Sequence, residues 1–184
     1  MNRASDLLDW AYTVMPKPIV RKASEMPFYD GTKQWVYQPK YDGVRAMVLL
    51  FPPGESYAAA VFSKNKTLLS LLKGPIEGFR HLGIHIFDCE LCGSTAHVLD
   101  KYVDSSDPLS EGYDFQQRLQ LTPEGVNSVG ELTLRRTPYV LDPTFDELLS
   151  LKETSRDLGP VEGIVAKPLS QELSQRLVAY KQKP

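Results

Sequence analysis

The sequence predicts an α+β fold in which antiparallel strands are combined with helices. Segments with strand character recur along the chain, and two of them flank the turn Pro52-Pro53-Gly54-Glu55 as the arms of a hairpin would. Segments with helical spacing of apolar residues lie between the strand segments. With 184 residues, 42% of them hydrophobic, the chain is long enough for one domain with its own core and too short for two of ordinary size.

The helices are expected at four places. The first covers residues 4–15, where the following apolar residues recur at helical spacing: Leu7, Leu8, Ala11 and Val14. Three further helices are expected at 68–82, 115–121 and 144–158. Within 68–82, Gly74-Pro75 should mark a break or a new start.

The strands are expected to account for most of the remaining chain. Their predicted ranges are 34–38, 45–51, 57–62, 83–91, 96–102, 164–167 and 177–183. The segment 16–33 is rich in proline and lysine and is expected to wrap the surface.

Charge and cysteine content restrict the possible functions. The net charge of −2 means that nucleic-acid binding by this domain alone should be weak and salt-sensitive. No apolar run approaches the roughly 18 residues that cross a bilayer, and the first ten residues do not resemble a secretory signal. Cys89 and Cys92 lack a second pair of metal ligands, which favours two free thiols in a reducing cytoplasm over a zinc site.

The segment Lys40-Tyr41-Asp42-Gly43-Val44-Arg45 is the main candidate for chemistry. Asp-Gly after a strand is, by itself, a common hairpin signal. Here, however, an aromatic strand precedes the lysine and an apolar strand follows the turn. A lysine becomes a nucleophile when nearby cations or a dry pocket favour its neutral form. The small glycine allows the backbone and a ligand to approach closely.

Three later segments complete the pattern. Asp88-Cys89-Glu90-Leu91 places two acids at the end of an apolar strand, and the segment 161–167 joins Glu162 to Lys167 through another. Near the end of the chain, Lys181 and Lys183 alternate, so both should lie on one face of a strand, which suits a phosphate. Each segment alone is more often structural, and it is their combination in this order that indicates a function.

This arrangement resembles the covalent nucleotidyltransferase superfamily, which comprises ATP-dependent DNA ligases, RNA ligases and mRNA capping enzymes. The resemblance covers residues 35–184. Ser63-Lys64-Asn65 is similar to the family's Ser-Arg-Asn segment, and Asp88–Leu91 to its Asp-Gly-Glu-Leu motif. Residues 97–109 resemble the next strand of small viral DNA ligases. The resemblance implies a ligase-type, ATP-grasp-like nucleotidyltransferase domain over residues 1–184.

The resemblance also implies a role for individual residues. Lys40 would form a lysyl-AMP phosphoramidate from ATP with the help of Mg²⁺ or Mn²⁺, and Glu162 would hold the metal. The other implied roles are adenine recognition by Gln38, ribose contacts by Arg45 and Glu90, and α-phosphate contacts by Lys181 and Lys183. Lys64 would stand where the family's arginine senses the phosphate of a nick.

Three departures from the family pattern affect these expectations. Lys64 lacks the bidentate fork of an arginine. Leu99 or His97 occupies the neighbourhood of the usual adenine-stacking aromatic residue. The OB-fold domain that usually follows is absent after Pro184, so the chain is expected to be a piece of a longer protein or a minimal protein whose partner supplies an OB-fold-like clamp.

Several functional alternatives remain open from the sequence. A DNA ligase acting on nicked DNA is favoured, followed by an RNA ligase, a capping-type guanylyltransferase and a non-catalytic nucleotide- or nick-binding module. The expected state is a monomer in the cytoplasm, the nucleoid or a viral replication site, not secreted and without a membrane partner.

Overall fold

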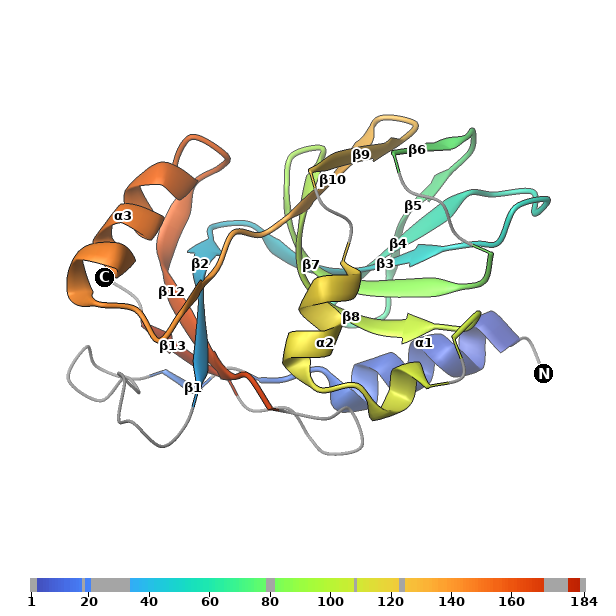
Figure 1. The fold of residues 1–184 in the computed structure, drawn as a ribbon. Coiled ribbons are helices and arrows are strands. Elements are labelled where there is room, and N and C mark those ends of the chain that lie inside the picture. The colour runs from blue at the N-terminus through green and yellow to red at the C-terminus, as the bar shows by residue number, and fades with distance from the viewer. Residues whose placement is uncertain are drawn as a thin grey trace.

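The computed structural model describes residues 3–17, 19–20, 34–78, 82–107, 109–122, 125–170 and 179–182. These residues form two sheets that lie next to each other (Figure 1). The smaller sheet has the strand order β1-β13-β12-β2-β11, and the larger has the order β5-β4-β3-β7-β8-β10-β9-β6. No helix among the described residues is long and apolar enough to cross a membrane.

The strands of the smaller sheet come from both ends of the chain and from its middle. They are β1 (Ile19–Val20), β2 (Trp35–Tyr41), β11 (Val140–Leu141), β12 (Val161–Pro168) and β13 (Tyr180–Gln182). The larger sheet consists of β3 (Val44–Leu50), β4 (Ala59–Ser63), β5 (Leu68–Leu72), β6 (Ile76–Glu77), β7 (His85–Cys92), β8 (Thr95–Asp104), β9 (Val126–Val129) and β10 (Leu132–Arg136). Only the short turn after Tyr41 separates β2 from β3, so the chain passes from one sheet to the other at the predicted Lys40–Arg45 motif.

Three α-helices lie within the described residues: α1 (Arg3–Val14), α2 (Phe115–Leu121) and α3 (Phe145–Ser155). They confirm the helices expected at 4–15, 115–121 and 144–158. Asp114 and Thr144 begin α2 and α3 with capping boxes, in which each side chain satisfies a free backbone N–H of the first turn.

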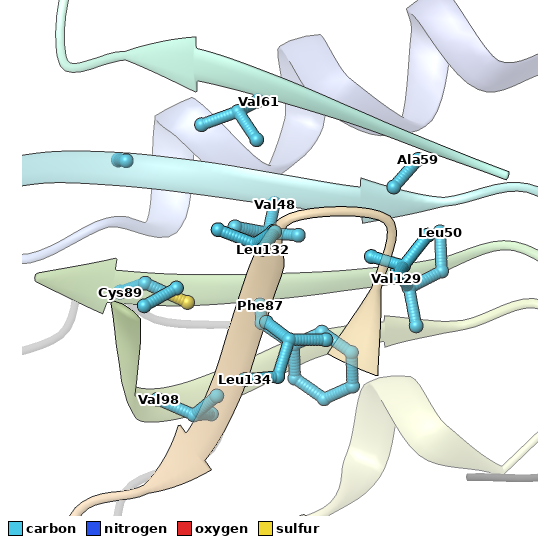
Figure 2. Packing of buried hydrophobic residues seen from close by; sticks show 12 residues of the cluster. Val48, Leu50, Ala59, Val61, Phe87, Cys89, Val98, Val129, Leu132 and Leu134 are labelled. Atoms are coloured by element: carbon cyan, nitrogen blue, oxygen red, sulfur yellow. The ribbon is translucent and has the colours of Figure 1, made fainter. Parts of the chain in front are cut away.

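The larger sheet is apolar on both faces. On one face, Leu8, Ala11 and Val14 of α1 pack against the sheet, where the buried partners include Met47, Leu49 and Ile86. On the other face the sheet curls around a second core, which contains Val48, Phe87, Val98 and Leu134 (Figure 2). The alternation along β3 assigns successive residues to the two cores.

The prediction of a helix at 68–82 is wrong. Leu68–Leu72 is β5, which pairs with β4, and Ile76–Glu77 is β6, which pairs with β9. Gly74, with φ of +106°, turns the chain between the two strands. A short leucine run fits a strand as well as a helix, and here pairing with a neighbouring strand decides the outcome.

Other differences concern the sheets. The strand expected at 34–38 continues to Tyr41, and β9 and β10 were not expected from the sequence. Most neighbouring strands are antiparallel, but β10 runs parallel to β8 and β1 runs parallel to β13, so the sheets are mixed. Much of the predicted surface segment 16–33 and part of the strand predicted at 177–183 lie outside the described residues.

Candidate active site

Lys40 and Glu162 form an ion pair between β2 and β12. In the antiparallel pairing of these strands, Tyr41 is opposite Val161 and Lys40 is opposite Gly163, which leaves Glu162 as an extra residue in a β-bulge. A bulge re-aims the side chain of its extra residue, and here it brings the carboxylate to Lys40 Nζ. The structure thus brings together the predicted nucleophile and the predicted metal ligand.

One face of the smaller sheet carries the other predicted residues. Gln38 and Lys40 are two residues apart on β2 and so share a face. Gln38 is opposite Val165 on β12, and Val165 is opposite Lys181 on β13, so Lys181 belongs to the same face. Lys183 lies outside the described residues.

The larger sheet contributes a row of polar residues across four strands. Arg45, Glu90, His97 and Arg135 are successive cross-strand neighbours on β3, β7, β8 and β10. Directly opposite residues point to the same face of a sheet, so this row forms a continuous polar strip. Burial raises the pKa of Glu90, while the charges of Lys40 and Arg45 act in the opposite direction, so Lys40 lies close to this strip.

Arg45 and Glu90 are both held in place by neighbours. The Arg45 guanidinium donates two hydrogen bonds to Asp88, and the Tyr102 hydroxyl donates to the same carboxylate. Burial alone would lower the pKa of Arg45, but the Asp88 charge outweighs it and raises that pKa. Glu90 Oε1 accepts a hydrogen bond of 3.2 Å from the backbone N–H of Gly43, which ties the motif turn to β7.

The two sheets meet directly at this point. Gln38 Nε2 donates to the Leu99 carbonyl at 3.2 Å, and the Tyr41 ring stacks on His97 with centroids 3.8 Å apart. Leu99 is half-buried on β8, and its main chain takes part in the contact. His97, the alternative considered for the adenine-stacking position, is fully buried under Tyr41.

Lys167 has no predicted role of its own, but the structure places it against Leu99, the residue that Gln38 also contacts. Its Nζ lies 3.5 Å from the Leu99 carbonyl oxygen and 4.9 Å from the Phe115 ring centroid. Burial lowers the pKa of Lys167 to about 8, although the carboxylates of Asp100 and Asp88 act to raise it. In the sequence, its spacing of two residues from Val165 indicates a shared strand face. The register of β12 with β2, in which Val165 is opposite Gln38, then places Lys167 on the face of Gln38.

A buried ion pair supports β8 beneath Leu99. Arg118 of α2 donates from Nε and Nη2 to the two oxygens of Asp100 at 2.8 and 3.1 Å, and from Nη1 to the Tyr113 carbonyl at 2.8 Å. Both side chains of the ion pair are almost fully buried. Asp100 follows Leu99 directly, so this pair fixes the backbone that Gln38 and Lys167 contact.

Lys64 lies in the exposed turn between β4 and β5. Ser63 at the start of this turn is opposite Ala46 of β3, the residue after Arg45. The turn is therefore at the same end of the larger sheet as the polar strip.

The carboxylates of the site suit a divalent ion that is shared with a nucleotide. No three His, Cys, Asp or Glu side chains converge as a ready-made metal cage in the part of the chain that the structure describes. Mg²⁺ in nucleotide sites keeps several waters and binds one or two carboxylates together with phosphate oxygens. Glu162, which is partly open to solvent, could supply such a carboxylate.

Comparisons with known proteins find similarity at the level of fold. No protein-family model and no curated protein matches the sequence. Among solved structures, the ligase domain of LigD from M. tuberculosis is 16% identical, with a TM-score of 0.52, and the alignment covers 94% of this chain and 60% of that one. A mycobacterial DNA ligase D complexed with ATP and MES has the same identity and coverage, with a TM-score of 0.50. The chain thus spans about 60% of the length of these structures, and it shares its fold with these ligase structures.

Proposed function

We propose that this chain is the nucleotidyltransferase domain of an ATP-dependent DNA ligase and that Lys40 is the residue that takes AMP. The contact between Lys40 and Glu162, beside Gln38 and Glu90 where the two sheets meet, carries the proposal. Support for DNA as the polynucleotide comes from the fold, because the similar solved structures are DNA ligase domains.

The first step is the transfer of AMP from ATP to Lys40. An ammonium group cannot attack phosphorus, so Lys40 must first leave its ion pair with Glu162, which stabilises the ammonium form, and release a proton to solvent. Positive neighbours on the same sheet face, such as Lys181, would favour this release. Lys40 Nζ then attacks the α-phosphorus. The N–P bond forms, the bond to the oxygen bridging the α- and β-phosphorus atoms breaks, and pyrophosphate leaves. The nitrogen loses its second proton to solvent, which gives the phosphoramidate.

Glu162 has two tasks in this step. In the free protein it holds the Lys40 side chain in one place through the ion pair, which keeps the nucleophile oriented. With a divalent ion bound, the Glu162 carboxylate would be one of its ligands, and the ion would supply positive charge to the phosphates as the transition state forms. Lys181 and Lys183 would add positive charge at the α-phosphate.

The side-chain amide of Gln38 favours recognition of adenine over guanine. Its Nε2 donates to the Leu99 carbonyl, which fixes the orientation of the amide. The other amide atom, Oε1, is buried and has no hydrogen-bond partner among the described residues. An acceptor in this position suits the N6 amino group of adenine and opposes the O6 oxygen of guanine.

The later steps act on a nick. An oxygen of the 5′-phosphate attacks the lysyl-AMP phosphorus, the N–P bond breaks, and Lys40 regains a proton as AMP moves to the DNA end. The 3′-hydroxyl then attacks the 5′-phosphate, loses its proton, and displaces AMP as the strand is sealed. Lys64 would bind the 5′-phosphate as a point charge.

The donor nucleotide tests this proposal. The purified chain would be incubated with Mg²⁺ and either ATP, GTP or NAD⁺, and its intact mass measured. We expect an AMP adduct from ATP alone, and nicked DNA should then remove the AMP from the protein. A GMP adduct from GTP would contradict the proposal in favour of a capping-type enzyme, and transfer to nicked RNA but not DNA would identify an RNA ligase.

A further inference from the structure

Helix α1 contacts the turn that carries Lys64 through a hydrogen bond and an ion pair. The Tyr12 hydroxyl donates a hydrogen bond to the Ser63 carbonyl. Lys66 Nζ forms an ion pair with Asp9 at 3.0 Å and lies 5.4 Å from the centroid of the Tyr12 ring. Two residues of the turn, on either side of Lys64, are thus tied to one helix.

The helix is itself firmly seated on the larger sheet. Ala11 and Val14, which flank Tyr12 in the sequence, are buried against a core that includes Met47 and Ile86. Tyr12 therefore has little freedom to move away from Ser63. Burial also raises the pKa of Tyr12 to about 12, so the hydroxyl keeps the proton that it donates.

The turn is also closed internally. Ser63 Oγ accepts from the backbone N–H groups of Asn65 and Thr67, both at 3.2 Å. The Ser63 backbone N–H donates to the Thr67 carbonyl at 2.8 Å, and the Lys66 N–H donates to the Ser63 carbonyl at 3.1 Å. The Ser63 carbonyl is thus the acceptor for both Lys66 and Tyr12.

We propose that α1 acts as a brace that positions Lys64 for the 5′-phosphate of a nick, with Tyr12 as the main positioning residue. The inference rests on the proposed ligase function. Lysine is a flexible point charge and lacks the fork with which an arginine aligns itself on a phosphate. Where lysine replaces arginine, the accuracy of the contact must come from the backbone, and the Tyr12–Ser63 hydrogen bond fixes that backbone at the residue preceding Lys64.

Tyr12→Phe tests the brace, because it removes one hydroxyl and keeps the ring. Tyr57→Phe is a matched control, since Lys73 lies 5.3 Å from the Tyr57 ring outside this turn. Two rates would be measured on the full chain: AMP adduct formation from ATP, and transfer of AMP from the protein to a nick with a 5′-phosphate. We expect Tyr12→Phe to slow transfer about fivefold, in line with the loss of one hydrogen bond, and to leave adduct formation as in the unaltered chain. Tyr57→Phe should change neither rate.

A double-variant cycle separates positioning from general destabilisation. In a Lys64→Ala background, Tyr12→Phe should slow transfer no further, because the side chain that it positions is gone. Equal slowing of both rates by Tyr12→Phe, or the same slowing with and without Lys64, would overturn the proposal.

Amide hydrogen exchange tests the brace without relying on ligase activity, so a failure of the brace can be distinguished from a failure of the proposed function. Tyr12→Phe should speed amide exchange at residues 63–67 and leave the β3–β7 pairing protected. Unchanged exchange at 63–67 would overturn the brace whatever the ligation assays show. If the unaltered chain formed no AMP adduct, the proposed function would fail, and with it the role of the brace in nick recognition.

Discussion

Tyr41 lies flat on His97, with ring centroids 3.8 Å apart and an angle of 17° between the ring planes. Tyr41 follows Lys40 on β2, while His97 belongs to β8 of the larger sheet. Alternate residues of a strand point to opposite faces. The Lys40 side chain therefore points toward Glu162, while the Tyr41 side chain packs against the other sheet. The stack therefore anchors the nucleophile's own backbone.

Burial of His97 makes the stability of the protein depend on pH. Burial, and then the positive charge of Arg135, lower the pKa of His97 to about 4, whereas an unfolded histidine titrates near 6.5. Below pH 6.5 the unfolded state therefore binds more protons, and stability falls as the pH decreases toward 4. By pH 5 the loss should be about 2 kcal/mol. Urea unfolding at pH 7.5 and pH 5 measures it, and a His97→Gln variant should lose less over this interval. An equal loss in the two proteins would contradict this assignment.

Gly159 should not tolerate a side chain. A Cβ at this position would lie 3.0 Å from His97 Nε2 and 3.3 Å from Tyr41 Cδ1. Both stacked rings are fully buried, so a shift of either ring would disturb the packing around it. We expect Gly159→Ala to lower the free energy of unfolding by about 1–3 kcal/mol. Gly112→Ala serves as the control, because a Cβ there meets nothing within 4 Å. Similar unfolding midpoints for the two variants would show that the stack can adjust.

Replacing only one partner of the Asp100–Arg118 ion pair should strongly destabilise the protein. Asp100→Asn leaves the Arg118 guanidinium buried without its counter-charge, which should lower the free energy of unfolding by about 3–5 kcal/mol. Removing the remaining charge in an Asp100→Asn, Arg118→Met double variant should recover part of this loss. A double variant less stable than Asp100→Asn would argue that the two side chains act independently.

Gln38 should set the preference for ATP over GTP. Gln38→Leu removes the buried acceptor Oε1 and the donor to the Leu99 carbonyl. We expect the ratio of adduct formation rates with ATP and GTP to fall about fivefold, the effect of one lost hydrogen bond of typical strength. Intact-mass time courses with each nucleotide give this ratio, and an unchanged ratio would exclude Gln38 from base recognition.

Much of the candidate site could be predicted because its residues lie in short local motifs. The order of Lys40, Glu90, Glu162 and Lys181 was visible in the sequence, and the structure brings Lys40 to Glu162 and places Gln38 and Lys181 on one sheet face. The bulge that aims Glu162 was not visible, because it depends on the register between two strands about 120 residues apart.

Features that depend on distant pairing were missed. The leucines of 68–72 fit a helix as well as a strand, and only the neighbouring β4 determines that they form β5. In the sequence, nothing distinguishes Arg118 from other polar residues of a helix. Its partner Asp100 is identified only when α2 packs against β8. The contact of Lys167 with the Leu99 carbonyl was missed for the same reason, because Leu99 belongs to the other sheet.

The most direct test of the central claim is to locate the AMP on the polypeptide. The chain would be incubated with ATP and Mg²⁺, digested, and its peptides analysed by tandem mass spectrometry, with Lys40→Ala and Lys152→Ala carried through the same procedure. Lys152 lies on α3 and has no part in the site, so its replacement should leave the adduct intact. We predict AMP on Lys40 as an acid-labile phosphoramidate in the unaltered chain and in Lys152→Ala, and no adduct in Lys40→Ala. AMP on another residue, or an adduct that persists in Lys40→Ala, would contradict the assignment of Lys40 as the nucleophile.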